Sequence, residues 1–243
     1  MSVLQVPDIH DFRNLPAPRL LSLAHYVAAS HALVCGDGSD TEEQIVSLAH
    51  AVADVLQSLL PGIRTGALLP YVDAWLLLSR IGFGKSHLPE VEIDALLRIV
   101  RAPVGEVSPA ARATALARLS TVRPGLLSTT ETRNLTWLID RFTAESSTAV
   151  LTDEESQHRI IFLASLQPPL ATHTSRTAVR DALDRIMRMP LDSLPTAKLA
   201  LIHTLFSFVG QPDIYLLRLL TDRPHSDPLT QKAYALELRL LTD

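Results

Sequence analysis

The chain has 243 residues, of which 47% are hydrophobic and 20% are charged, so it can bury a core and is not globally disordered. Its net charge of −4 and its lack of a basic patch argue against a nucleic-acid partner. The single cysteine excludes an internal disulfide and a cysteine-rich metal site. The first residues lack the basic and apolar segments of a signal peptide, so we expect a cytoplasmic protein that does not enter a membrane.

The expected secondary structure is helical throughout, because polar caps and prolines alternate with amphipathic runs and no stretch alternates like a strand. Residues 1–16 are expected to form an irregular arm. About eleven helices are expected to follow, opening in chain order at Pro18, Ser39, Ala67, Pro89, Ser108, Ser128, Thr152, Thr174 or Ser175, Pro195, Pro212 and Asp227. We therefore predict a single all-α domain over residues 1–243. A compact layered array is preferred to a solenoid-like one, because no sequence repeat is recognisable.

The most apolar segment runs from Ala67 to Phe83, where only Asp73, Ser79 and Arg80 are plainly polar. Its apolar side chains surround the helical wheel, which predicts a buried central helix. A buried Asp73 needs a partner or must become neutral, because desolvating a carboxylate is costly. Arg80 lies two turns further along the same face. Asp73 is therefore either a packing group in an ion pair or a functional group, such as a general base or the anchor of a substrate amine.

His203 is a second polar group in an apolar run, LALIHTLFSFVG. Small and polar residues, including Thr196 and Ser207, fall on its side of the helical wheel. This side is either the solvent face of a half-buried helix or the wall of a pocket in which the imidazole supplies a proton near neutral pH. His25, Tyr71, His158 and His173 could join such a wall, although their spacing does not require it.

Three other motifs are interpreted as structural. The segment Gly82–Ser86 resembles a phosphate-binding loop but lacks the glycine spacing and the preceding strand of that motif. Glu155-x-x-His158 matches half of a di-iron carboxylate site, and no second copy exists. Cys35 follows a helix end and is expected to be a small packed residue rather than a nucleophile. We therefore expect no metal and no cofactor.

The segment IHTLFSFVG, together with the polar residue inside the apolar third helix, resembles a family of small all-helical proteins of actinobacterial natural-product biosynthesis. This family includes the heteromeric aziridine-forming proteins of azinomycin-type and vazabitide-type pathways. The resemblance implies that a substrate amine, on a molecule held by a carrier protein, displaces a sulfate ester intramolecularly. Asp73 would position or deprotonate the amine, His203 would neutralise the leaving sulfate, and Arg80 would contact it. It also implies a complex of two related helical chains, in which this chain could be the supporting subunit.

Two functions remain open. The first is a cofactor-independent enzyme of small-molecule biosynthesis, with Asp73 and His203 as catalytic residues and Arg80, Tyr71, His158 and Ser207 as substrate contacts. The second is a non-catalytic helical adaptor or partner-binding subunit, in which these residues are packing groups. The two are distinguished by whether Asp73 and His203 line one cavity. Either function is compatible with a homo-oligomer or a heteromer, because apolar residues remain near both ends of the chain.

Overall fold

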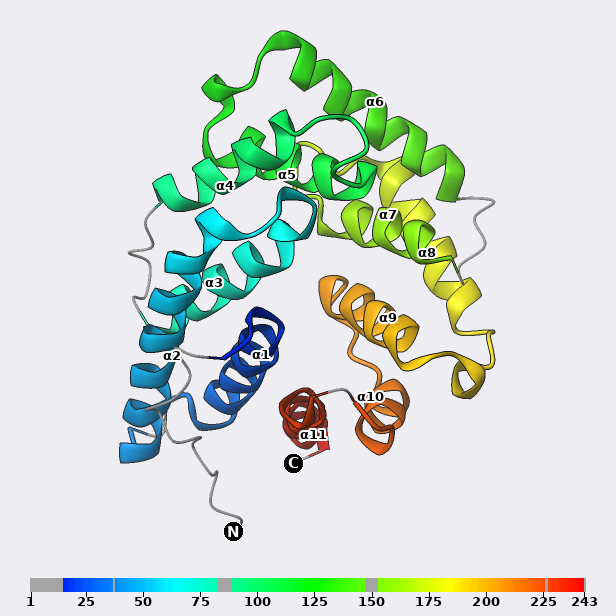
Figure 1. Ribbon diagram of the computed structural model, residues 1–243. Helices are drawn as coiled ribbons and strands as arrows, with labels where there is room; N and C mark the ends of the chain where they lie inside the picture. Colours follow the sequence, from blue (N-terminus) through cyan, green and yellow to red (C-terminus); the bar gives the residue numbers. More distant parts are fainter. Residues whose placement is uncertain (1–14, 37, 83–88, 147–152, 226, 243) are drawn as a thin grey trace. The chain divides into compact units, whose positions relative to one another are not determined.

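The protein is described by a computed structural model that covers residues 15–36, 38–82, 89–146, 153–225 and 227–242 (Figure 1). These residues contain eleven α-helices, four short 3-10 turns and no strand, which confirms the all-α prediction. The helices are α1 (Ala17–Val34), α2 (Asp40–Leu59), α3 (Leu68–Gly82), α4 (Pro89–Arg101), α5 (Pro109–Val122), α6 (Thr129–Ser146), α7 (Glu154–Ser165), α8 (His173–Ile186), α9 (Thr196–Phe208), α10 (Ile214–Asp222) and α11 (Pro228–Thr242). The expected N-terminal arm lies almost wholly outside the described residues.

The helices pack into two compact units, and each unit is described here by itself. The first consists of the described residues up to Ala95 and from Leu217 onward, and the second of residues 96–216. The boundaries fall inside α4 and α10 rather than in a linker. The segment between Gly82 and Pro89, which the sequence favours as a boundary, lies largely outside the described residues. The single-domain expectation stays a prediction.

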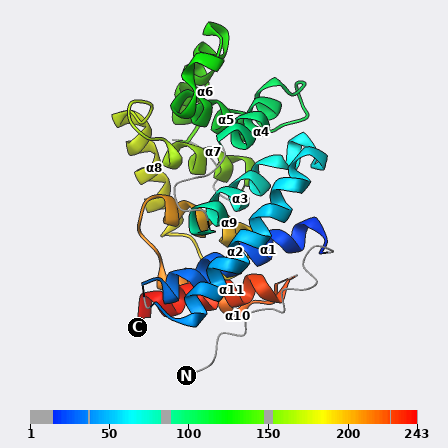
Figure 2. The same cartoon turned by 90° about the vertical axis from the view of Figure 1, so that its left-hand side faces the viewer.

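In the first unit, α1 packs against α2, α3 and the C-terminal helix α11, and α2 packs against α3. Figures 1 and 2 both place α11 beside α1, although the two helices lie at opposite ends of the sequence. Ala29 of α1 and Ala233 of α11 are buried with Tyr26 at this contact. The small alanine side chains let the two helix backbones approach closely, which ties the C-terminal helix to the first unit.

In the second unit, α7 is the helix around which the others pack. It contacts α5, α6, α8 and α9, while α6 also contacts α5 and α8. The rings of Phe142 and Phe162 meet edge to face, 5.7 Å apart, where α6 crosses α7. An edge-to-face pair of buried aromatic rings adds to the stability that their burial provides. One face of α6 therefore packs into the core of this unit, and its other face is exposed.

Two predicted helix caps are confirmed in the second unit. The hydroxyl of Ser108 accepts a hydrogen bond from the Ala111 amide at the start of α5, with Pro109 at the first helical position. The hydroxyl of Ser128 accepts one from the Glu131 amide, and the Glu131 carboxylate accepts one from the Ser128 amide at 2.6 Å. This reciprocal pair is the capping box that the sequence predicts for α6.

Two other predicted caps are misplaced by one to three residues. Helix α7 is capped by the Asp153 carboxylate, which accepts from the Ser156 amide at 2.9 Å, whereas the predicted cap Thr152 lies outside the described residues. Helix α8 is capped by Thr172, not by Thr174 or Ser175. Neighbouring Thr, Ser and Asp residues have similar capping propensities, so the tertiary position of the helix selects among them.

Helix α3 has an exposed face, so the prediction that it is buried all round is wrong. Asp73, Leu77 and Arg80, which are spaced by four and three residues, are all exposed. Trp75 and Leu78 on the other side are buried in the first unit. Leu77 is 42% exposed, although it is apolar. A polar residue at this position would have marked the solvent face, so the helical wheel of α3 looks uniformly apolar.

One described run, Asp40–Gly62, is long and apolar enough to cross a membrane by length and composition alone. It comprises α2 and the 3-10 turn that follows, and α2 packs against both α1 and α3. Core helices of soluble proteins meet the same criterion, so this run is compatible with a soluble protein.

Candidate functional site

The predicted site residues of the first unit lie on α3. Asp73 and Arg80 are on its exposed face, and Tyr71 is buried. The expectation that Asp73 is an interior, desolvated carboxylate is therefore wrong. The desolvation on which its predicted role as an interior base depends is therefore absent.

The predicted site residues of the second unit lie on two packed helices. His203 of α9 is buried, with 8% of its surface exposed, whereas Ser207 one turn later is exposed. The Ser207 hydroxyl donates a hydrogen bond to the His203 carbonyl at 3.0 Å. His158 is half-buried on α7, the helix that packs against α9. The side of α9 that carries His203 is therefore partly solvent-exposed, although the imidazole itself belongs to the interior.

Asp73 and His203 belong to different units, so their predicted role in one cavity stays a prediction.

The three motifs that the sequence suggests are structural lie as follows. The segment Gly82–Ser86 lies outside the described residues except for its first glycine. The Glu155 carboxylate pairs with Arg159 one turn later, at 3.3 Å, which gives it a structural role. Cys35 is exposed rather than packed, because it follows the last turn of α1 in the open connection to α2.

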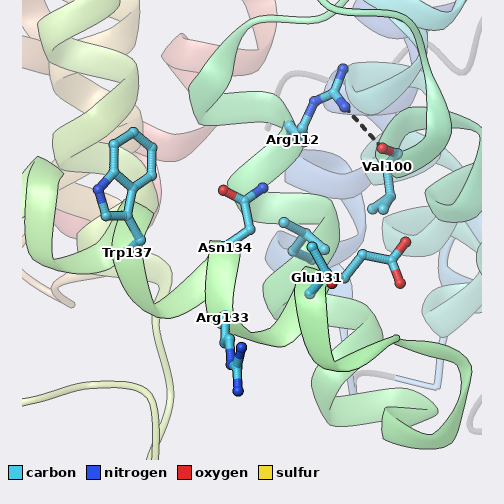
Figure 3. A pocket seen from close by; sticks show the side chains of 8 residues that line it. Val100, Arg112, Glu131, Arg133, Asn134 and Trp137 are labelled. Carbon is cyan, nitrogen blue, oxygen red and sulfur yellow. Dashed lines mark hydrogen bonds between the residues drawn. The ribbon is translucent and has the colours of Figure 1, made fainter.

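A pocket of about 500 Å³ lies in the second unit, where the end of α4 meets α5 and α6 (Figure 3). It is lined by Val100, Arg112, Leu116, Thr130, Glu131, Arg133, Asn134 and Trp137. Most of these residues lie on α6. The pocket is open to solvent and combines apolar walls with amide and charged groups, which is the composition of a recognition site.

The back of the pocket is held by Arg112 of α5. Its guanidinium donates to the carbonyl of Val100 at 3.0 Å and to the carbonyls of Ala102 and Pro103 at 2.7 and 3.1 Å. These carbonyls lie at and just beyond the C-terminus of α4, where backbone acceptors lack helical partners and a cation is favourable. Arg112 therefore fixes the α4–α5 connection and is a positioning residue of the pocket wall.

The carboxylate of Glu131 forms another part of the pocket wall. Hydrogen bonds from the backbone amide and the hydroxyl of Ser128, with a smaller contribution from the charge of Arg101, hold the pKa of Glu131 below its usual value. Glu131 is thus kept ionised and is held by the helix cap. In Figure 3 the Asn134 amide lies on the same side of α6 as Arg112, whereas Arg133 points away from the other labelled side chains.

Trp137 is the most unusual side chain of the pocket. It is 53% exposed, although tryptophan is the largest apolar side chain of the protein. The Arg141 guanidinium stacks over its ring, 5.2 Å from the centroid, and also pairs with Glu145 at 2.7 Å. Glu145 in turn pairs with Arg159 of α7 at 2.6 Å. The indole therefore makes a cation–π contact that is linked by ion pairs to the next helix, while about half of the residue stays accessible to solvent.

The sequence contains a signal for this site, although no recognised motif includes it. Thr130, Asn134, Trp137 and Arg141 are spaced by four, three and four residues, so they form one stripe along α6. The opposite stripe, Leu135, Leu138, Ile139 and Phe142, is buried. A tryptophan on the polar stripe of an amphipathic helix is an exception to this division, and it marks the stripe as a candidate functional surface.

Comparisons with protein-family models, with curated proteins and with solved structures found no match to this chain. The resemblance to aziridine-forming proteins, and the ring closure it implies, therefore stay predictions.

Proposed function

We propose that the protein is a non-catalytic, helical partner-binding protein, and that its second unit binds an acidic segment of another protein at the α5–α6 pocket. The observation that carries this proposal is the exposed, pre-positioned Trp137 in the pocket wall. A rigid aromatic side chain loses little conformational entropy on binding, and tryptophan and arginine are the residues most enriched at binding hot spots.

The charge around the pocket supports an acidic partner. Residues 98–141 contain seven arginines and no lysine, against two glutamates and one aspartate. Of these arginines, Arg101, Arg123, Arg133 and Arg141 are exposed. A cationic surface attracts carboxylates and accelerates their association. The pocket would take an apolar side chain of the partner against Trp137, with acidic residues at its rim.

The enzyme hypothesis has less support. It relies on Asp73 as an interior, desolvated carboxylate, and Asp73 is exposed. Aziridine formation, a carrier-bound substrate, a related second chain and a cytoplasmic location stay predictions. A second helical chain with an acidic surface segment would satisfy the binding proposal as well.

The experiment is a selection of displayed random peptides on the whole chain. We expect the selected peptides to be acidic and to carry an aromatic or aliphatic anchor. Trp137→Ala should weaken their binding by at least about tenfold, as truncation of a hot-spot side chain does. Arg133→Glu should weaken it through charge. Arg176→Glu is the matched control, because Arg176 is an exposed arginine of the same unit on α8, outside the pocket.

Selected peptides that are not acidic, or that bind the Trp137→Ala variant with unchanged affinity, would contradict the proposal. Sedimentation of the chain alone tests whether the pocket is instead occupied by a second copy of this chain. If the wild-type chain self-associates and Trp137→Ala makes it monomeric, the pocket is an interface between copies, and the proposed separate partner is wrong.

A further inference from the structure

The connection between α1 and α2 gathers three side chains of metal-ligating type, far from the pocket in sequence. They are His31 in the last turn of α1, Cys35 just after that helix and Glu42 in the first turn of α2. One ligand atom of each, an imidazole nitrogen, the thiol sulfur and a carboxylate oxygen, lies within 4.8 Å of the other two. The thiol is exposed and the other two side chains are half-buried, so the cluster is open to an ion from solvent.

The sequence builds this cluster from short-range geometry. His31 and Cys35 are four residues apart, which puts their side chains on one face, and the Cys35 amide extends the helical pattern by donating to the His31 carbonyl at 2.8 Å. Gly36 and Gly38 have φ angles of 89° and 62°. Such angles are strained for residues with a Cβ, and the glycines let the chain reverse within a few residues and bring Glu42 back toward α1.

Glu42 is already oriented by the connection. Its carboxylate accepts hydrogen bonds from the Gly36 amide at 3.0 Å and the Gly38 amide at 2.9 Å. Each carboxylate oxygen has two lone pairs, so these two bonds leave acceptor capacity on both oxygens. Carboxylates that bind metals are commonly held by such outer hydrogen bonds, which orient the ligand in advance.

We propose that His31, Cys35 and Glu42 form a binding site for a zinc ion, with the fourth position open to water. Imidazole, thiolate and carboxylate are the three ligand types of zinc in proteins, and a site with three protein ligands keeps one position free. A thiolate and a carboxylate together balance the charge of the divalent ion. The end of α1 adds the negative partial charge of its free carbonyls.

The geometry needs only a small adjustment. Zinc bonds of about 2.0–2.3 Å in a tetrahedron place the ligand atoms roughly 3.3–3.8 Å apart. The three ligand atoms now lie within 4.8 Å of one another. Side-chain rotations can bring them to the distances of a tetrahedral site, because the Cys35 thiol is exposed. A bound ion would link the end of α1 to the start of α2, so it would stabilise the first unit. This inference is independent of the peptide-binding proposal, which concerns the second unit.

The test is a titration of the metal-free, reduced full-length chain with cobalt(II), the spectroscopic substitute for zinc. Because Cys35 is the only cysteine, a thiolate-to-cobalt charge-transfer band reports this residue alone. We expect a stoichiometry of one, and displacement of cobalt by zinc. At a zinc concentration one hundred times Kd, the melting temperature should rise by about 5–10 °C.

Substitutions of the three proposed ligands test whether they bind one ion together. Loss of a group that only hydrogen-bonds to a metal ligand already costs about ten- to a hundredfold in affinity. His31→Gln and Glu42→Gln each remove a proposed direct ligand, so each should weaken cobalt binding by at least about tenfold. Cys35→Ser should abolish the charge-transfer band. His173→Gln, at an exposed histidine on α8, is the matched control and should leave binding unchanged. Melting without metal checks that Glu42→Gln, which alters a hydrogen-bonded carboxylate, still folds.

The inference is overturned if cobalt gives no thiolate band. It is equally overturned if the band survives both His31→Gln and Glu42→Gln with unchanged affinity, because Cys35 then binds the ion alone. His31→Gln leaves the Gly36 and Gly38 hydrogen bonds in place, so its result stands even if Glu42→Gln does not fold.

Discussion

At the scale of single residues, Tyr234 has the most perturbed environment of the described part of the chain. The residue is 6% exposed, and the centroid of its ring lies 5.2 Å from that of His25 and 5.4 Å from that of His225. Glu237, one turn later on α11, hydrogen-bonds His25 at 2.6 Å. Burial first, and then the negative charge of Glu237, raise the pKa of Tyr234 to about 12.

The raised pKa has a defined consequence for stability. The folded chain favours the neutral phenol, so this contribution is complete below the unfolded pKa of about 10 and is lost as the pH rises from about 10 to about 12. We expect the last step of a spectrophotometric phenolate titration to disappear in Tyr234→Phe. The exposed Tyr215 is the control, and Tyr215→Phe should retain that step. A last step that persists in Tyr234→Phe would contradict the assignment.

At the scale of elements, α3 shows that the faces of an apolar helix are assigned by its neighbours. Leu77 and Leu78 are adjacent in sequence and identical in chemistry. Leu77 is 42% exposed and Leu78 is 0% exposed, because α1 and α2 cover only one side of the helix. The helical wheel alone ranks these leucines equally. Contacts with the rest of the unit distinguish them.

This pair provides a matched test of the first unit. Leu78→Ala should lower the free energy of unfolding by about 2–5 kcal/mol, because it leaves a cavity in a packed core. Leu77→Ala should change it by less than about 1 kcal/mol, because the removed atoms are partly in water. Urea unfolding can be followed by the fluorescence of the buried Trp75 in a Trp137→Phe background. Similar losses in the two variants would mean that α3 has no solvent face.

At the scale of the whole molecule, charge is divided unequally between the two units. Residues 1–95 and 217–243 contain fifteen acidic and nine basic residues, a net charge of −6, whereas residues 96–216 contain eleven and thirteen, a net charge of +2. The total of −4 hides this difference. The prediction from composition that no basic patch exists therefore misses the arginine-rich stretch from Arg98 to Arg141.

The charge distribution predicts how partner binding depends on salt. An acidic peptide selected on the chain should associate at least about tenfold more slowly when the ionic strength rises from about 0.02 M to about 0.5 M, because screening shortens the reach of the arginines. Arg133→Glu should reduce this dependence, and the exposed Arg64 of the first unit, changed to Glu, is the control. Stopped-flow measurements of association test this expectation. A salt-independent rate would mean that apolar contact alone drives binding.

The sequence by itself determined the helical class, the number of helices and several of their starts. These depend on local chemistry: Ser108 caps α5 and Ser128 with Glu131 caps α6 because a hydroxyl or carboxylate reaches an amide only three residues away. The i,i+4 placement of His31 and Cys35 is local in the same way, and so was within reach of the sequence.

Only the tertiary structure decided which faces are buried and which groups meet. The exposure of Asp73 and of Trp137 depends on how helices pack, and the return of Glu42 toward His31 depends on how a connection reverses. The pocket combines residues from α4, α5 and α6, which local sequence patterns do not relate to one another. Burial is set by contacts between segments distant in the chain, and a helical wheel contains no information about those contacts.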